Sequence, residues 1–113
     1  MTYVLLIYSS RTPGQPTPGD ADQRSLAAHR ALQRDLGTAM RSVVRLDELP
    51  TAHTVRATPS GHEVSSGPYM ETKEWLVGFY LVDCADEAAA FAHARRLADA
   101  HHAIEVRPVT WNR

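Results

Sequence analysis

His29 is the side chain of this sequence best suited to moving a proton, because a histidine titrates close to neutral pH. It stands in a series of apolar residues at steps of three and four, which predicts one face of a helix: Leu26, Leu32, Leu36 and Met40. On that face His29 can serve as a general acid or base toward a small molecule. The same position also suits a core histidine satisfied by one hydrogen bond, and the pattern leaves both interpretations open.

Two carboxylates, Asp47 and Glu71, are candidates to orient His29. A carboxylate that accepts a hydrogen bond from an imidazole holds it in one tautomer and stabilises its charged form. Asp47 equally suits a solvated strand end. Glu71 equally suits an ion pair with Lys73 that fixes a turn and contributes little if exposed. The sequence therefore names the two acids without choosing between these roles.

Four further residues are candidates to bind a substrate. Lys73 is the single lysine of the chain and stands among carboxylates, where it can hold an anionic group. Arg107 alternates with apolar neighbours and suits either a carboxylate anchor or an interface ion pair. Tyr8 and Tyr80 each combine an apolar ring with a polar tip, although packing in a core or at a dimer interface explains them as well.

Other residue clusters carry no recognisable chemistry. His101 and His102 are adjacent, so on a helix they face different ways, and no cysteine or aspartate stands at metal-ligand spacing around them. Cys84 has no CxxC partner or neighbouring histidine that would mark a nucleophile. Phosphate-binding, serine-elbow and dinucleotide motifs are missing from the sequence. We therefore expect neither a metal nor a cofactor.

The first half of the chain predicts a strand, a loop, a helix and a strand. The apolar run Tyr3 to Tyr8 is typical of a central strand covered on both faces. The Pro- and Gly-rich stretch around residues 12–19 breaks regular structure, and Asp20 or Asp22 can cap the helix that follows. Residues 42–46 then predict a second strand.

The second half begins with a predicted hairpin, His53 to Thr58 and His62 to Ser65. Trp75 to Asp83 is the strongest strand pattern of the chain. Its alternation predicts that Trp75, Val77 and Phe79 share one face, with Tyr80 on the other. Asp86 caps a second helix expected to run to about His102, and residues 103–109 form the last strand.

This order of elements predicts one α+β domain over residues 1–113. Two right-handed β-α-β crossovers separated by a hairpin form an antiparallel sheet with both helices on one face, the ferredoxin-like split βαβ plan. The other face of the sheet then exposes an apolar surface, and such surfaces usually mark interfaces. We therefore expect a two-fold homodimer, sheet against sheet.

Composition restricts the partners and the compartment. The net charge is −1 and the arginines are scattered, which argues against nucleic acid and against an anionic membrane surface. The apolar N-terminal run is too short to span a bilayer and lacks the basic start of a signal peptide. With one cysteine, no intrachain disulfide can form, and a cytoplasmic location is expected.

Three ordered segments of the chain resemble the YCII-related proteins called the DGPF family. Ser66 to Glu74 is similar to the signature Asp-Gly-Pro-Phe-x-Glu-Thr-Lys-Glu, with Ser66 in place of the Asp and Tyr69 in place of the Phe. The N-terminal strand and the closing segment Ile104 to Val109 are similar to those of the family. The resemblance covers nearly the whole chain.

The resemblance implies a dimeric α+β barrel and several possible activities. A few relatives in the wider group are enzymes, such as a dehydrochlorinase, in which a His–Asp pair is thought to be catalytic, and other relatives are joined to sigma factors. The first hypothesis is a cofactor-independent enzyme that uses His29 for elimination, isomerisation, cyclisation or hydrolysis of a small organic molecule. The alternative is a non-catalytic small-molecule-binding or regulatory module, because one fold can host many functions.

Overall fold

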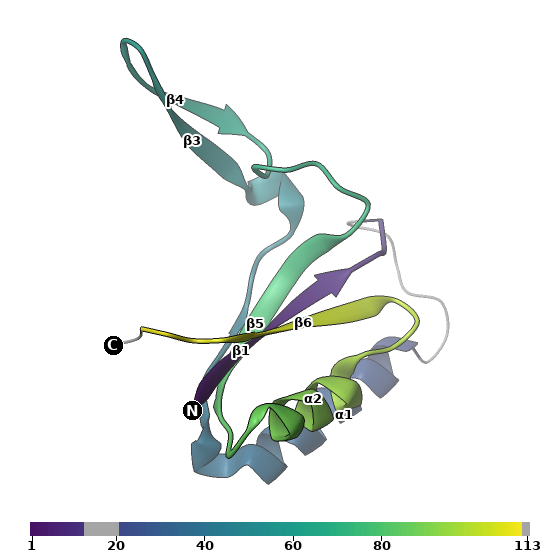
Figure 1. The fold of residues 1–113 in the computed structure, drawn as a ribbon. Coiled ribbons are helices and arrows are strands. Elements are labelled where there is room, and N and C mark those ends of the chain that lie inside the picture. The colour runs from purple at the N-terminus through teal and green to yellow at the C-terminus, as the bar shows by residue number, and fades with distance from the viewer. Residues whose placement is uncertain (13–20, 112–113) are drawn as a thin grey trace.

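The computed structural model describes residues 1–12 and 21–111 of the chain (Figure 1). Most of the Pro-rich stretch predicted as a loop, and Asp20 with it, lies outside these residues. The elements follow in the order β1 (Thr2–Ser9), α1 (Ala21–Leu36), a 3-10 turn (Gly37–Ala39), β2 (Met40–Arg45), a 3-10 turn (Leu49–Thr51), β3 (His53–Thr58), β4 (Gly61–Ser66), β5 (Trp75–Asp83), α2 (Glu87–Leu97) and β6 (His102–Pro108).

The main sheet has four antiparallel strands in the order β2-β5-β1-β6. Both helices lie on one face of this sheet (Figure 1). The units β1-α1-β2 and β5-α2-β6 interleave so that β1 and β5 occupy the centre, which is the ferredoxin-like split βαβ arrangement. The predicted α+β fold class is confirmed.

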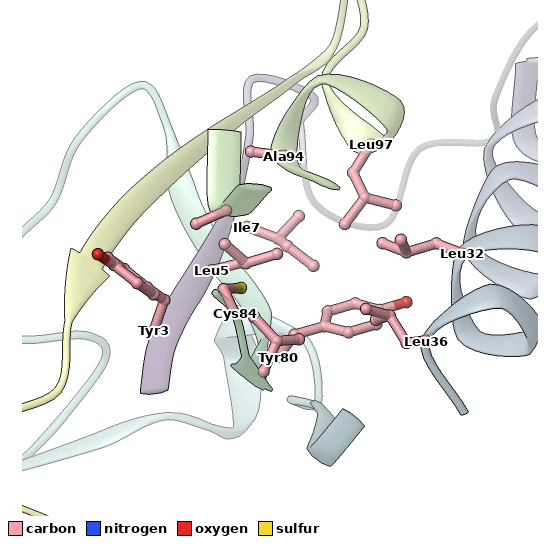
Figure 2. Close-up of a cluster of buried hydrophobic side chains, with 11 residues drawn as sticks. Tyr3, Leu5, Ile7, Leu32, Leu36, Tyr80, Cys84, Ala94 and Leu97 are labelled. Atoms are coloured by element: carbon pink, nitrogen blue, oxygen red, sulfur yellow. The ribbon is translucent and has the colours of Figure 1, made fainter. Parts of the chain in front are cut away.

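The core lies between the sheet and the helices (Figure 2). Strand β1 alternates strictly, burying every second residue on the helix-covered face and leaving the residues between them half-buried. Strand β1 is thus central, as predicted, but the helices of this chain cover one of its faces. The buried residues are Tyr3, Leu5 and Ile7 from β1, Leu32 and Leu36 from α1, Tyr80 and Val82 from β5, Cys84 after it, and Ala90, Ala94 and Leu97 from α2.

The predicted apolar face of the first helix is partly wrong. Leu32 and Leu36 are buried, but Leu26 is 49% exposed and Met40 already belongs to β2. Leu26 and Leu32 are six residues apart, which separates them by roughly 120° around a helix of 3.6 residues per turn. The buried face therefore centres on Leu32 and Leu36. Asp22, a predicted cap, lies inside the first turn of α1.

A β-bulge overturns the predicted faces of β5. The pairing with β1 shifts between Ile7 and Tyr8, so that Ile7 lies opposite Gly78 but Ser9 lies opposite Trp75. Residues directly opposite each other share a face, and Ser9 is buried on the helix-covered side. Trp75 therefore joins the helix-covered face rather than the face of Phe79. One extra residue in a strand reverses which side chains point to which face of the sheet. No local sequence pattern predicts the position of such a bulge.

The second helix is shorter than predicted. Its start is confirmed, because the Asp86 side chain accepts a hydrogen bond from the amide of Ala89 at 2.8 Å. The helix ends at Leu97, and a tight turn from Asp99 to His102 leads into β6. The Asp99 carboxylate accepts a hydrogen bond from the His101 amide at 2.8 Å, a bond that favours a turn over continued helix.

The predicted hairpin is confirmed as β3 and β4, which pair with each other and extend away from the main sheet (Figure 1). The radius of gyration is 16.0 Å, whereas a compact chain of this length has about 13 Å. Val55 and Val64 face each other across the hairpin and are 64% and 65% exposed. The hairpin is thus an arm with an apolar pair at its middle.

Candidate functional site

His29 binds the hydroxyl of Tyr80 from across the space between α1 and the sheet. Its Nδ1 lies 2.7 Å from the Tyr80 hydroxyl oxygen, and the two rings stack with centroids 5.7 Å apart and planes 22° apart. Gln33, one turn further along α1, donates its amide N–H to the same oxygen at 2.9 Å. Tyr80 is 1% exposed, so its hydroxyl is held in place by packing as well as by these bonds.

The hydroxyl of Tyr80 can serve both protonation states of His29. A phenol oxygen accepts two hydrogen bonds, and Gln33 uses one of these positions. When Nδ1 carries the proton, the Nδ1–H group donates a hydrogen bond to the Tyr80 oxygen, and the other ring nitrogen, Nε2, keeps a free lone pair. The imidazolium makes the same bond. In this tautomer His29 can therefore gain and lose a proton at Nε2 without rearranging its partner.

Burial and nearby charges keep His29 neutral. Desolvation lowers the pKa of His29 from its ordinary value, and the neighbouring His102 and Arg45 lower it further, whereas Asp99 acts in the opposite direction. Burial raises the pKa of the Tyr80 phenol, partly offset by the Gln33 hydrogen bond, so Tyr80 stays protonated near neutral pH. A half-buried neutral imidazole of lowered pKa is the form in which a histidine accepts a proton.

A second histidine is held by a carboxylate nearby. The Nδ1 of His102 lies 2.9 Å from Oδ1 of Asp99, and the His102 side chain is 16% exposed. Burial raises the pKa of Asp99, but hydrogen bonds from the His101 amide and from His102 outweigh this and leave that pKa below its ordinary value. His102 lies opposite Ser9 on the helix-covered face. The group His29, Gln33, Tyr80, Asp99 and His102 is called the His29 site below.

Three members of the His29 site are not among the candidates that the sequence offers: Gln33, Asp99 and His102. The sequence pattern places His102 at the end of the second helix, but the residue opens β6 and pairs with Asp99 three residues earlier. The signal was the aspartate at a turn position, which can bind residues two or three further on. Gln33 is four residues after His29 and so shares its helical face, a spacing visible in the sequence.

The predicted acids lie elsewhere. Asp47 is exposed, and its carboxylate accepts the amide of Glu48 at 2.8 Å. Glu71 is exposed in the connection between β4 and β5. Within the described residues, the hydrogen-bond partner of the His29 ring is a hydroxyl from β5 rather than either carboxylate.

The predicted binding residues divide between the two sides of the sheet. Tyr80 belongs to the His29 site, whereas Tyr8 and Lys73 line an open hollow together with Ser10, Thr72, Glu74, Ala103, Ile104 and Glu105. Tyr8 and Glu105 stand on the face of the sheet without helices, because the alternation of β1 and its pairing with β6 place them there. Arg107 is exposed on that face, with its Nε 3.9 Å from Glu105. The Lys73 hollow is thus separate from the His29 site.

Across residues 1–12 and 21–111, no group of three or more His, Cys, Asp or Glu side chains is placed to hold a metal ion. None of the helices within these residues is long and apolar enough to cross a membrane.

The split βαβ sheet, with a histidine and a tyrosine joined beneath its helices, defines a small ferredoxin-like α+β domain. The chain belongs to the YCII-related domain family, whose sequence model matches residues 1–112. It is 35% identical over 114 residues to an uncharacterized protein of Rhizobium meliloti (strain 1021), an alignment that covers 96% of this chain and 92% of that protein. The predicted resemblance to the YCII-related family is thus confirmed.

Proposed function

We propose that this protein is a cofactor-independent enzyme in which His29 transfers a proton to and from a small organic molecule. The observation that carries this proposal is the hydrogen bond between His29 Nδ1 and the Tyr80 hydroxyl, which in the Nδ1–H tautomer leaves Nε2 as the reactive nitrogen. Gln33 and packing hold that hydroxyl in place, so the base is oriented before a substrate arrives.

The proposed step begins with a substrate C–H bond next to a carbonyl group. His29 Nε2 takes the proton, the electron pair of the C–H bond moves into the carbonyl as an enolate, and His29 becomes an imidazolium. Return of the proton at a different atom completes an isomerisation. Departure of an anionic leaving group from the neighbouring carbon, followed by loss of the His29 proton to that group or to water, completes an elimination. The Tyr80 oxygen accepts the Nδ1 hydrogen bond throughout, which stabilises the charged intermediate.

Titration of the histidine ring signals by NMR tests this proposal, alone and with small aromatic and carboxylic compounds. We expect His29 to titrate below the ordinary histidine range and to respond selectively to a compound of the panel. Tyr80→Phe should change the His29 response while His62→Gln, on the exposed hairpin, should not. A His29 signal that neither titrates nor responds to any compound would identify it as a core residue and contradict the proposal.

A non-catalytic small-molecule-binding or regulatory module is the second candidate, favoured by the Lys73 hollow. Tyr8 and Lys73 line it together with Thr72 and Glu74 of the signature segment. Thr72 and Glu74 are tied to each other, since the Thr72 hydroxyl donates to the Glu74 carbonyl. Compounds of the same panel that shift signals of Lys73 and Tyr8, without shifting His29, would favour this candidate.

The protein is proposed to act as a homodimer. The strand pairing places five half-buried apolar residues on the sheet face without helices: Val4, Leu6, Val44, Phe79 and Leu81. A second copy would cover this apolar face by two-fold symmetry. An isolated two-stranded hairpin is only marginally stable in water. Packing on a second chain would therefore also stabilise the arm, whose Val55 and Val64 side chains are exposed.

The proposed partners and compartment follow from charge and thiol chemistry. The net charge of −1 does not suit nucleic acid or an anionic membrane surface. Cys84 is free and buried, which suits a reducing compartment such as the cytoplasm.

A further inference from the structure

Arg45 ends strand β2 on the side of the sheet that carries the His29 site. The pairing of β2 with β5 places Val43 opposite Tyr80 and Arg45 opposite Gly78. Residues directly opposite each other share a face, and Tyr80 faces α1 through its bonds to His29 and Gln33. Val43 and Arg45 therefore stand on the helix-covered face, next to the tyrosine that holds His29.

Helix α1 does not cover this edge of the sheet. Val43 is 43% exposed and Arg45 is exposed, although both stand on the same face as the fully buried Tyr80. The edge beside the His29 site is thus open to a ligand, with an apolar surface from Val43 and a cation from Arg45. The charge of Arg45 is close enough to lower the pKa of His29.

Gly78 brings Arg45 close to the centre of the sheet. A Cβ at Gly78 would overlap the carbonyl oxygen of Val44, so a larger residue there would push β2 away from β5. The glycine therefore permits a close approach of the strand that ends in Arg45.

The guanidinium of Arg45 is unpaired within the described residues. Four other arginines there have carboxylate partners: Arg11 with Asp22, Arg41 with Asp83, Arg96 with Asp35, and Arg107 with Glu105. The remaining described arginines without such a partner lie on the helices or on the hairpin rather than in the main sheet. An arginine presents its donors in a planar fork that matches the two oxygens of a carboxylate. Arg45 combines that free fork with a position beside a proton-transfer residue.

We propose that Arg45 binds the carboxylate of a small organic acid whose apolar part lies against Val43 and whose reactive carbon faces His29. This inference rests on the proposed function of His29 and names the substrate class. It also moves the anion-binding role away from Lys73 and Arg107, which lie on the other face of the sheet or at its end.

Binding of benzoate and of its uncharged analogue benzamide tests the inference. The probes are titrated into the full chain while NMR follows the Arg45 Nε–H and His29 ring signals. We expect benzoate to shift both signals and benzamide to shift neither comparably. Arg45→Ala should weaken benzoate binding about tenfold or more, because a hydrogen bond to a charged group is lost. Arg95→Ala, at an exposed arginine of α2, is the matched control and should bind as the wild type does.

The outcomes separate this inference from the proposed function. Equal binding of benzoate by the wild type and Arg45→Ala would overturn the inference, as would an Arg45 signal that does not move up to the solubility limit of benzoate. The proposed function stands in those cases if His29 still titrates and responds to another compound. Conversely, an Arg45-dependent benzoate response with a silent His29 would support anion binding and contradict the catalytic role. Arg45→Ala and Arg95→Ala should both remain folded, and an amide correlation spectrum of each variant checks this.

Discussion

The Nδ1 atom of His29 and the hydroxyl oxygen of Tyr80 lie 2.7 Å apart, although the two residues are 51 positions apart in the chain. Because Tyr80 is almost completely buried, this hydroxyl is shielded from water and depends on His29 and Gln33 for its hydrogen bonds. The pair therefore contributes to both stability and chemistry, and the two contributions can be measured separately.

Tyr80→Phe should destabilise the fold by about 1–3 kcal/mol, since it leaves the buried polar groups of His29 and Gln33 without their partner. Urea unfolding followed by circular dichroism measures the change. Gln33→Leu, which removes one donor and leaves the His29 bond in place, should cost less. A Tyr80→Phe variant as stable as the wild type would show that the hydrogen bonds contribute little to folding.

Stability should fall as the pH is lowered through the histidine range, and His29 should cause part of this fall. The unfolded chain binds a proton at His29 near pH 6.5, while burial and the neighbouring His102 and Arg45 lower the pKa in the folded chain against the opposing effect of Asp99. Above pH 6.5 the residue is neutral in both states. Between pH 6.5 and the lowered folded pKa, the unfolded state binds more protons and gains relative stability.

Unfolding free energies at several pH values between 8 and 5 measure this effect. His29→Gln should make the dependence less steep, whereas His62→Gln, at an exposed position of the hairpin, should leave it unchanged. An equally steep dependence in His29→Gln would show that the His29 pKa is not lowered by folding.

Leu81→Lys should disrupt the proposed dimer. Leu81 stands on the sheet face without helices, and a lysine buried there would lack a partner, a cost of about 3 kcal/mol or a hundredfold weaker association. Leu26→Lys, at an exposed leucine of α1, is the matched control and should leave association unchanged. Sedimentation velocity over a range of concentrations reports both, and a wild type that stays monomeric throughout would contradict the dimer.

Asp99→Ala should weaken the turn that begins β6. The Asp99 carboxylate accepts bonds from the His101 amide and from the His102 ring, and their loss should cost about 1–2 kcal/mol. Asp99→Asn keeps an acceptor oxygen and should retain most of the stability. Thermal unfolding and amide exchange at the start of β6 measure the effect. Equal stability of the two variants would show that the charge, rather than the turn geometry, holds His102.

Contacts between near neighbours were predictable from the sequence. The Asp86 cap joins residues three apart, and the hairpin of β3 and β4 closes through its own turn. Such features depend on local conformational preferences. The shared helical face of His29 and Gln33 is also local, because residues four apart on a helix are neighbours, and it could have been predicted from that spacing.

Contacts that depend on strand register were not predictable. The bulge opposite Tyr8 moves Trp75 to the helix-covered face, against the alternation of its own strand. The prediction that a carboxylate would orient His29 relied on residue types, whereas the partner is set by which β5 side chain lies beneath α1.

The sequence by itself determined the order of the elements, the α+β plan, the family and the presence of a histidine on the first helix, because each is written in residues close together or in an ordered motif. Only the tertiary structure decided that Tyr80 holds His29, that Asp99 holds His102, and that Lys73 lies apart from both. The physical reason is that these relationships arise from strand pairing and helix packing between distant segments, where a shift of one residue exchanges the two faces of a strand.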